Sequence, residues 1–126
     1  MKTLRLLEDV VFPDYSKDTI TAKIDTGAAS GAIHAEDIDI IRKEDGFYLT
    51  FRPFGLDKTV EADRFKVLHV KSSNGIREQR FVVYTEIQIS GDTYPIQISL
   101  RDRSNMATEV IIGSRFLRNK FIVDPR

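Results

Sequence analysis

The stretch KIDTGAASGAIHA, residues 23–35, follows an alternating run and passes at once into a hydroxyl and a glycine. In the preceding run, TITAKI (19–24), apolar and polar side chains alternate, which predicts a half-buried strand. Asp25 comes directly after that strand, so we expect its carboxylate in a partly buried place, where desolvation favours the protonated form. The aspartate is a turn former, a helix cap or a working acid, and the rest of the sequence must distinguish these roles.

The residues after Asp25 suit a working acid as well as a turn. Thr26 supplies a donor and an acceptor that can fix a loop, and Gly27 permits a close approach by another backbone or a substrate. Ala28 and Ala29 keep the surroundings small. Asp-Thr-Gly alone is a weak signal, so a plain turn remains the alternative.

Alternation of period two recurs along most of the chain and predicts hairpins. Turn signals stand at KEDGF (43–47), SSNG (72–75) and 90–92. Short helical segments are expected around 35–41 and over 114–120. We therefore expect an all-β protein with one short C-terminal helix, forming a single domain over residues 1–126. Its expected strands are 19–24, 46–51, 64–71, 77–90, 93–100, 109–112 and the terminal FIVDP run, with a loop at 105–108.

Composition narrows the function classes. Lys+Arg and Asp+Glu both number 19 among 126 residues, which removes the main compositional argument for a nucleic-acid partner. The absence of cysteine excludes disulfides and thiol nucleophiles. The first dozen residues lack the apolar region of a signal peptide, and no stretch approaches the roughly 20 apolar residues that span a bilayer. We expect a cytoplasmic protein with no nucleic-acid or membrane partner.

Three features, taken in order, resemble the retropepsin-type aspartic proteases. IDTGA (24–28) is similar to the catalytic loop of that family, and IIGSRFL (111–117) to the apolar-apolar-glycine segment before its C-terminal helix. The hairpin 81–100 stands where the family has the strand pair after its flap. More closely, the chain over residues 5–126 resembles a small bacterial and archaeal family labelled ATP-dependent zinc proteases, through KIDTGA (23–28), LRDRS (100–104), IIG (111–113) and IVDP (122–125).

The resemblance implies a closed β-barrel with a flap hairpin, and hydrolysis of peptide bonds by two carboxylates that share a proton across one water. The chain has one Asp-Thr-Gly, so we expect a homodimer with Asp25 beside its own symmetry mate. Asp25 is then the acid/base, Thr26 braces the two loops, and Gly27 offers backbone contacts. The implied substrate-binding residues are Ala28, Ala29, Ile112 and the flap tip Ser72, Ser73, Asn74, Gly75 and Ile76.

The zinc and ATP of that label find no support in the residues. There is no HExxH, only two histidines, and no GxxxxGK[ST]. His34, Glu36 and Asp37 do not have a zinc-site spacing, so we expect no cofactor and no metal. A metal-dependent peptidase and a catalytically silent peptide-binding module remain the alternatives.

Three further points follow from the resemblance. KEDGF (43–47) competes with the 72–76 tip as the flap, because the chain is longer than the compact viral enzymes between its two motifs. Ala29 and Ser30 stand where viral members often carry an acidic pair. Family members are encoded near a glutamate ligase, which makes peptides or proteins with acidic or poly-glutamate tails the candidate substrates.

Overall fold

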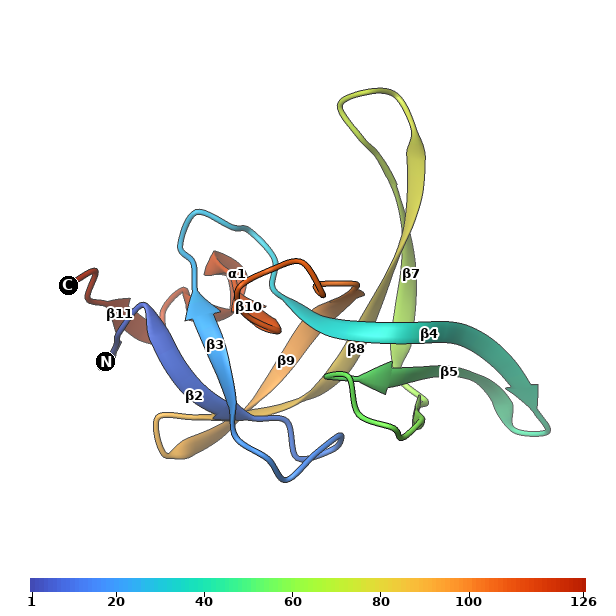
Figure 1. Ribbon diagram of the computed structural model, residues 1–126, viewed down its shortest axis with the longest axis horizontal. Helices are drawn as coiled ribbons and strands as arrows, with labels where there is room; N and C mark the ends of the chain where they lie inside the picture. Colours follow the sequence, from blue (N-terminus) through green and yellow to red (C-terminus); the bar gives the residue numbers. More distant parts are fainter.

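The computed structural model describes residues 1–126 as eleven strands and one short helix (Figure 1). The elements are β1 (Lys2–Leu4), β2 (Leu7–Val11), β3 (Ile20–Ile24), β4 (Ala32–Lys43), β5 (Gly46–Pro53), β6 (Val60–Ala62), β7 (Phe65–Lys71), β8 (Arg77–Ile89), β9 (Asp92–Arg101), β10 (Val110–Ile112), α1 (Ser114–Leu117) and β11 (Phe121–Val123).

Six strands close into a barrel. The order β10-β3-β2-β8-β9-β4 returns to β10, because β10 pairs with β3 along one edge and with β4 along the other. The β10–β3 and β4–β9 pairs are parallel and the others are antiparallel. A cluster of 24 buried apolar residues forms the core, and full burial of each large side chain contributes about 1.5–3 kcal/mol. The expected all-β closed barrel with one short C-terminal helix is confirmed.

The turn between β8 and β9 follows its sequence signal. Ile89 pairs with Asp92, which leaves Ser90 and Gly91 as a two-residue loop. Both have positive φ, 53° and 84°, which is the backbone of a type I′ turn and matches the right-handed twist of the flanking strands.

The prediction of a helical segment around 35–41 is wrong, because these residues belong to β4. Opposite β5, the register moves by one residue between Glu36 and Asp39, and Asp37 adopts a φ of +52°. A bulge of this kind inserts one extra residue into one strand and interrupts the alternation of faces. The interrupted pattern is what resembled a helical turn in the sequence.

The remaining differences concern short elements. The C-terminal helix begins at Ser114 as expected but ends at Leu117, and Asn119 then turns the chain with a φ of +64°. Three strands, β1, β2 and β6, were absent from the expected set; two of them have only three residues, too few to display a period. The helix is far too short to cross a membrane.

Two hairpins extend from the barrel (Figure 1). One joins β4 to β5 and is supported along part of its length by β6. The other joins β7 to β8. Strand β9 begins to pair with β8 only at Phe81, so residues 77–80 are paired with β7 alone. The outer part of this second hairpin therefore stands free of the barrel.

Tyr15 gives a stability prediction at alkaline pH. Its side chain is buried against Phe51, and burial raises the pKa of its phenol from 10.0 to about 12, although the neighbouring Thr85 hydroxyl offsets part of the effect. A raised pKa in the folded state stabilises the protein below pH 10, and this contribution is lost as the pH rises toward 12. It amounts to about 2–3 kcal/mol.

The prediction is measured by urea unfolding between pH 8 and 12. The free energy of unfolding of the wild type should fall over the upper part of this range, and Tyr15→Phe should remove much of that fall. An equal fall in Tyr15→Phe would mean that other groups cause it.

Candidate active site

The Asp25 loop starts where two parallel strands end together. β3 and β10 run side by side with Ile24 opposite Ile112. The Asp25 N–H donates to the Ile112 carbonyl at 2.9 Å, so the last pairing of the two strands fixes the position of Asp25. Both isoleucines are buried, which anchors the loop to the hydrophobic core of the barrel.

The loop is also joined to the start of α1. The Ser114 and Arg115 N–H groups donate to the Ala28 and Ala29 carbonyls at 2.7 and 3.1 Å. The helix has no side-chain cap, and these loop carbonyls take that role for its first free N–H groups. The segment that follows β10 thus holds the Asp25 loop directly, although the two lie more than 80 residues apart in the sequence.

Two glycines allow this close packing. A Cβ on Gly113 would lie 2.8 Å from the Ala28 carbonyl oxygen and 2.8 Å from the Ser30 carbonyl carbon. A Cβ on Gly31 would lie 2.5 Å from the Ile111 carbonyl oxygen. All three neighbours are backbone atoms that cannot move aside easily. The sequence pointed to Gly113 but not to Gly31. The position of Gly31 directly after the Asp25 loop was the only signal for it.

The Asp25 carboxylate is oriented by its own loop. Its Oδ1 accepts the Gly27 N–H at 2.9 Å, and a Cβ on Gly27 would lie 3.2 Å from the same oxygen. The side chain is 31% exposed in the single chain, so it is partly buried, as expected. Its Oδ2 lies 4.0 Å from the ammonium of Lys23, an exposed residue that the sequence reasoning did not single out. Such an exposed pair contributes little.

The other predicted site residues have different surroundings. Thr26 and Ala29 are exposed and Ala28 is half-buried, so the loop presents these residues at the surface. Ile112 is fully buried. Its side chain belongs to the core and its carbonyl holds Asp25, so it supports the loop and does not line a surface where a substrate binds.

The 72–76 tip closes on itself at the end of the β7–β8 hairpin. The Ser72 N–H donates to the Ile76 carbonyl and the Gly75 N–H to the Ser72 carbonyl, both at 2.9 Å. The Ser72 hydroxyl and the Ile76 N–H also contact the Asn74 side chain. Gly75 has a φ of +85°, and Ile76 is 60% exposed.

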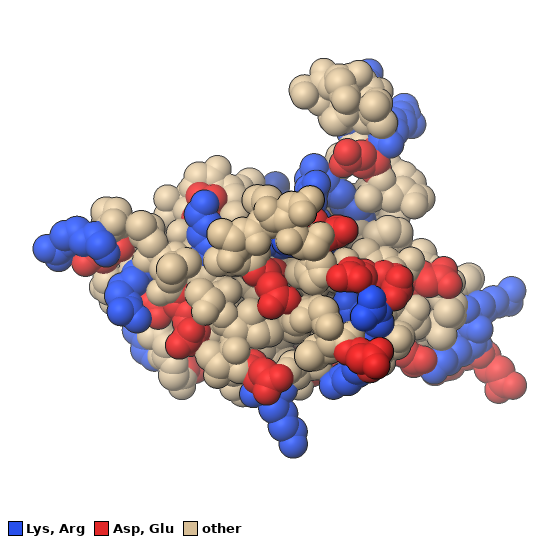
Figure 2. Space-filling view, viewed as in Figure 1, with Lys and Arg blue, Asp and Glu red and all other residues tan.

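The two hairpin tips point in different directions (Figure 1). β3 leads upward in this view into the Asp25 loop, and the β7–β8 hairpin rises on the same side of the molecule. The tip of the β4–β5 hairpin, at residues 44–45, extends sideways and downward. Figure 2 shows the β7–β8 tip standing clear of the body, over a face on which acidic and basic side chains are mixed.

His34 and its acidic neighbours form a structural cluster. The ring Nε2 lies 2.7 Å from a Glu36 carboxylate oxygen, and Nδ1 accepts the Arg103 N–H at 2.8 Å. Since Nδ1 accepts, Nε2 carries the proton that is donated to Glu36. The arrangement ties β4 to the loop that precedes β10.

The same cluster does not fit a zinc ion. Both ring nitrogens of His34 are used, and the carboxylates of Glu36 and Asp37 bind Arg52 at 2.9 and 2.6 Å. No group of three histidine, cysteine, aspartate or glutamate side chains in the chain is arranged to hold a metal ion. The residues that sequence reasoning weighed as ligands therefore pair with each other and with arginine.

A closed six-stranded barrel with an Asp-Thr-Gly loop held against the start of a C-terminal helix defines the retropepsin-like class of fold. The sequence matches the RimB-like family, described as "Retropepsin-like aspartic endopeptidase RimB", over residues 4–126. The chain belongs to this family. Its description names an aspartic endopeptidase and not the zinc protease of the label considered above.

The chain is also similar to a solved structure over nearly its full length and to a segment of larger proteins. A solved structure of a Legionella pneumophila protein of unknown function is 27% identical, with a TM-score of 0.79, and the match covers 98% of this chain and 93% of that one. Proteins named "Probable alpha-L-glutamate ligase" from Shewanella pealeana and Desulfotalea psychrophila are 30% and 28% identical over 120 residues. These matches cover 90% of this chain but only 26% of each ligase, so the chain spans about a quarter of these relatives.

Proposed function

We propose that the protein is a homodimeric aspartic endopeptidase in which two copies of Asp25 activate a water molecule. The observation that carries the proposal is the Asp25 loop itself. Its carboxylate is held by the Gly27 N–H, and the loop is fixed to β10 and α1 in a chain of the retropepsin-like aspartic endopeptidase family.

The chemistry requires two carboxylates, and this chain has one Asp-Thr-Gly. The ion-pair neighbour of Asp25 is a lysine, so the second carboxylate is taken from another copy. Surfaces beside the loop suit such a contact. Leu6, whose carbonyl accepts the Ile24 N–H, and Leu7 are about half exposed. Exposed apolar residues next to a site of this kind favour an interface.

The chain termini offer a second contact region. β1 and β11 form a two-stranded sheet on their own, and neither pairs with the barrel, so the outer edge of each strand is free. Ile122 of β11 is 51% exposed. Free strand edges with an apolar side chain readily pair with another chain. We expect the two-fold axis to bring these sheets together as well as the Asp25 loops.

The reaction then follows from the paired carboxylates. Two adjacent carboxylates cannot both ionise, so the pair holds one proton. The ionised carboxylate takes a proton from water while the water oxygen attacks the carbonyl carbon of the peptide. The protonated carboxylic acid donates its proton to the carbonyl oxygen. Collapse of the tetrahedral intermediate breaks the C–N bond: the leaving nitrogen receives the proton that the first carboxylate took from water, and the second carboxylate recovers its proton from a hydroxyl of the intermediate. Thr26 is exposed, and in this proposal its hydroxyl bridges the two loops.

The β7–β8 tip is the flap in this proposal. It rises on the same side as the Asp25 loop, and the outer part of its hairpin is paired with no other strand (Figure 1). A hairpin held only at its base can bend over a bound peptide and exclude water. Residues 72–76 then contact the substrate together with Ala28 and Ala29.

Acidic peptides, poly-glutamate tails among them, are the proposed substrates. Relatives with a segment 30% and 28% identical to this chain are named "Probable alpha-L-glutamate ligase", which favours a glutamate-rich peptide as the shared ligand. Ala29 and Ser30 are uncharged, so acidic side chains of a bound peptide would meet no carboxylate at these two positions.

The proposal is tested with two synthetic peptides that share one sequence and end in six glutamates or six glutamines. Mass spectrometry of the products should show cleavage of the glutamate peptide by the wild type, unchanged by a chelator. Binding of both peptides without turnover would support the silent peptide-binding module instead. Loss of cleavage in the chelator would support a metal-dependent peptidase.

A further inference from the structure

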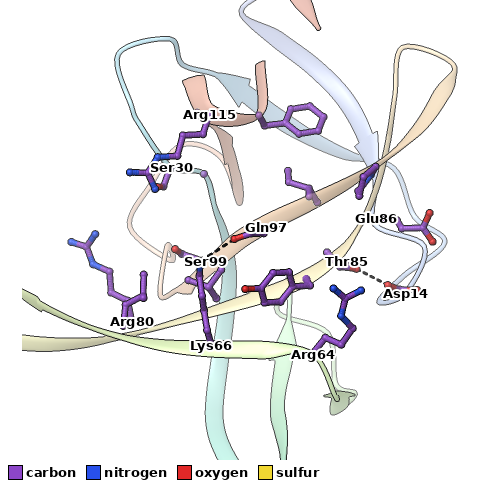
Figure 3. A pocket seen from close by; sticks show the side chains of 18 of the residues that line it. Asp14, Ser30, Arg64, Lys66, Arg80, Thr85, Glu86, Gln97, Ser99 and Arg115 are labelled. Atoms are coloured by element: carbon purple, nitrogen blue, oxygen red, sulfur yellow. Dashed lines mark hydrogen bonds between the residues drawn. The ribbon is translucent and has the colours of Figure 1, made fainter. Parts of the chain in front are cut away.

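A wide groove lies outside the barrel, and Asp25 is not among the residues that line it. It has a volume of about 980 Å³. Its floor is the outer face of β8 and β9, where Tyr84 stands opposite Gln97. Lys66 of β7 and Arg80 of β8 border one side, and Ser30 and Arg115 border the other. We call this cavity the outer groove; Figure 3 shows its lining side chains.

Five basic side chains line the outer groove, and none has an acidic partner within 4.0 Å. Lys66 donates to the neutral Gln97 at 3.0 Å, and Arg115 to the neutral Ser30 hydroxyl at 3.3 Å. The Nε of Arg80 is buried and has no hydrogen-bond partner at all. A buried donor without an acceptor is costly, and an anion bound to the Arg80 guanidinium would offset that cost through charge-assisted hydrogen bonds. The basic residues are Arg64, Lys66, Arg80, Arg115 and Lys120.

The charge in the outer groove is polarised. Arg80 and Arg115 lie at the end marked by Ser30, and Lys66 lies between the two ends (Figure 3). The acidic residues Asp14 and Glu86 lie at the far end, beside Arg64. The third acidic lining residue, Asp63, precedes Arg64 directly in the sequence. An anionic ligand is therefore attracted to the end nearest Ser30 and repelled from the other.

That end of the groove is lined by residues that follow or hold the Asp25 loop. Ser30 follows Asp25 by five residues, and Arg115 belongs to the helix whose N–H groups hold the loop. An extended peptide advances about 3.3 Å per residue, so a strand that passes the loop reaches the groove within a few residues.

We infer that Lys66, Arg80 and Arg115 form a second binding site, which holds a carboxylate-rich segment of peptide beside the scissile bond. The inference rests on the proposed function, because it takes that segment to be part of the substrate. The residues favour a peptide over a nucleic acid. The Arg64 and Lys66 cations lie over the ring of Tyr84, at 5.2 and 5.8 Å from its centre, where they compete with a stacking base for the ring.

The test measures binding of fluorescein-labelled hexaglutamate by fluorescence anisotropy. All proteins carry Asp25→Asn, so that no cleavage interferes. The groove variant adds Lys66→Gln, Arg80→Gln and Arg115→Gln. The control variant has the same change in charge outside the groove, with Lys58→Gln, Arg101→Gln and Arg118→Gln. We expect the groove variant to bind at least about tenfold more weakly than the control variant.

Equal affinities of the groove and control variants for hexaglutamate would overturn the inference. Tighter, groove-dependent binding of a single-stranded oligonucleotide of equal charge would overturn the assignment to carboxylates. If the groove variant has a lower unfolding temperature than the control, Arg115→Gln alone is compared with Arg118→Gln, since both side chains are exposed on the same segment. A weaker binding of Arg115→Gln supports the site, and equal binding contradicts it.

The binding assay separates this inference from the proposed function. If no peptide is cleaved by the wild type but hexaglutamate binding depends on the groove, the peptidase proposal fails and the binding site stands. If the wild type cleaves peptides but the groove and control variants bind hexaglutamate equally, the peptidase stands and the second site fails.

Discussion

Asp25→Asn is expected to lower peptide cleavage by about 10²–10⁴-fold, the usual contribution of a general acid or base. The amide has nearly the shape of the carboxylate, and its oxygen can still accept the Gly27 N–H, so the loop should keep its geometry. The amide cannot take a proton from water, and a dimer of the variant has no ionised member in its pair.

The measurement compares turnover of the glutamate-tailed peptide by the wild type, Asp25→Asn and Asp57→Asn. Asp57 is exposed and far in sequence from the loop, so its variant should retain full activity. Thermal unfolding of all three proteins should coincide within a few degrees. Wild-type turnover in Asp25→Asn would show that Asp25 is a turn residue and that other groups perform any hydrolysis.

Gly113→Ala is expected to cause a large loss of stability. The added Cβ would lie 2.8 to 3.0 Å from three backbone atoms of residues 28–30, and none of them is the end of a flexible side chain. Overpacking of this kind costs about 2–3 kcal/mol. In a chain of this size the corresponding fall in unfolding temperature is about 10 °C.

The same substitution should also impair catalysis, because the loop must move to make room. The Ala28 carbonyl accepts the Ser114 N–H, and both ends of that bond are displaced when Gly113 gains a side chain. Ser114→Ala is the matched control: it alters the next residue without touching the backbone contacts and should stay within about 0.5 kcal/mol of the wild type. An unfolding temperature of Gly113→Ala equal to that of Ser114→Ala would contradict the packing described here.

The sequence predicted the parts of the fold in which alternation is unbroken. Residues 19–24 and 93–100 show a clear period of two, and both lie in strands. The bulge at Asp37 broke that period and made a strand resemble a helical turn. Strands β1 and β6 have three residues each, so they carry no pattern that could be recognised.

Part of the candidate site could be predicted from the sequence, and the outer groove could not. Asp25 and Gly113 were identified through resemblance to a family, and the structure brings their two segments together. The outer groove could not be predicted, because Lys66, Arg80 and Arg115 are scattered over some 50 residues. Only the closure of the barrel, which folds β8 and β9 beside α1 and the Asp25 loop, gathers them.

In the proposed enzyme, each active site contains one Asp25 from each of two chains. This sharing is tested most directly by refolding wild type with Asp25→Asn in varied proportions at constant total concentration. If each site needs both carboxylates, activity follows the square of the wild-type fraction, so an equal mixture retains about a quarter of the wild-type activity. If a single chain suffices, activity follows the fraction itself and the equal mixture retains about half, which would contradict the shared site.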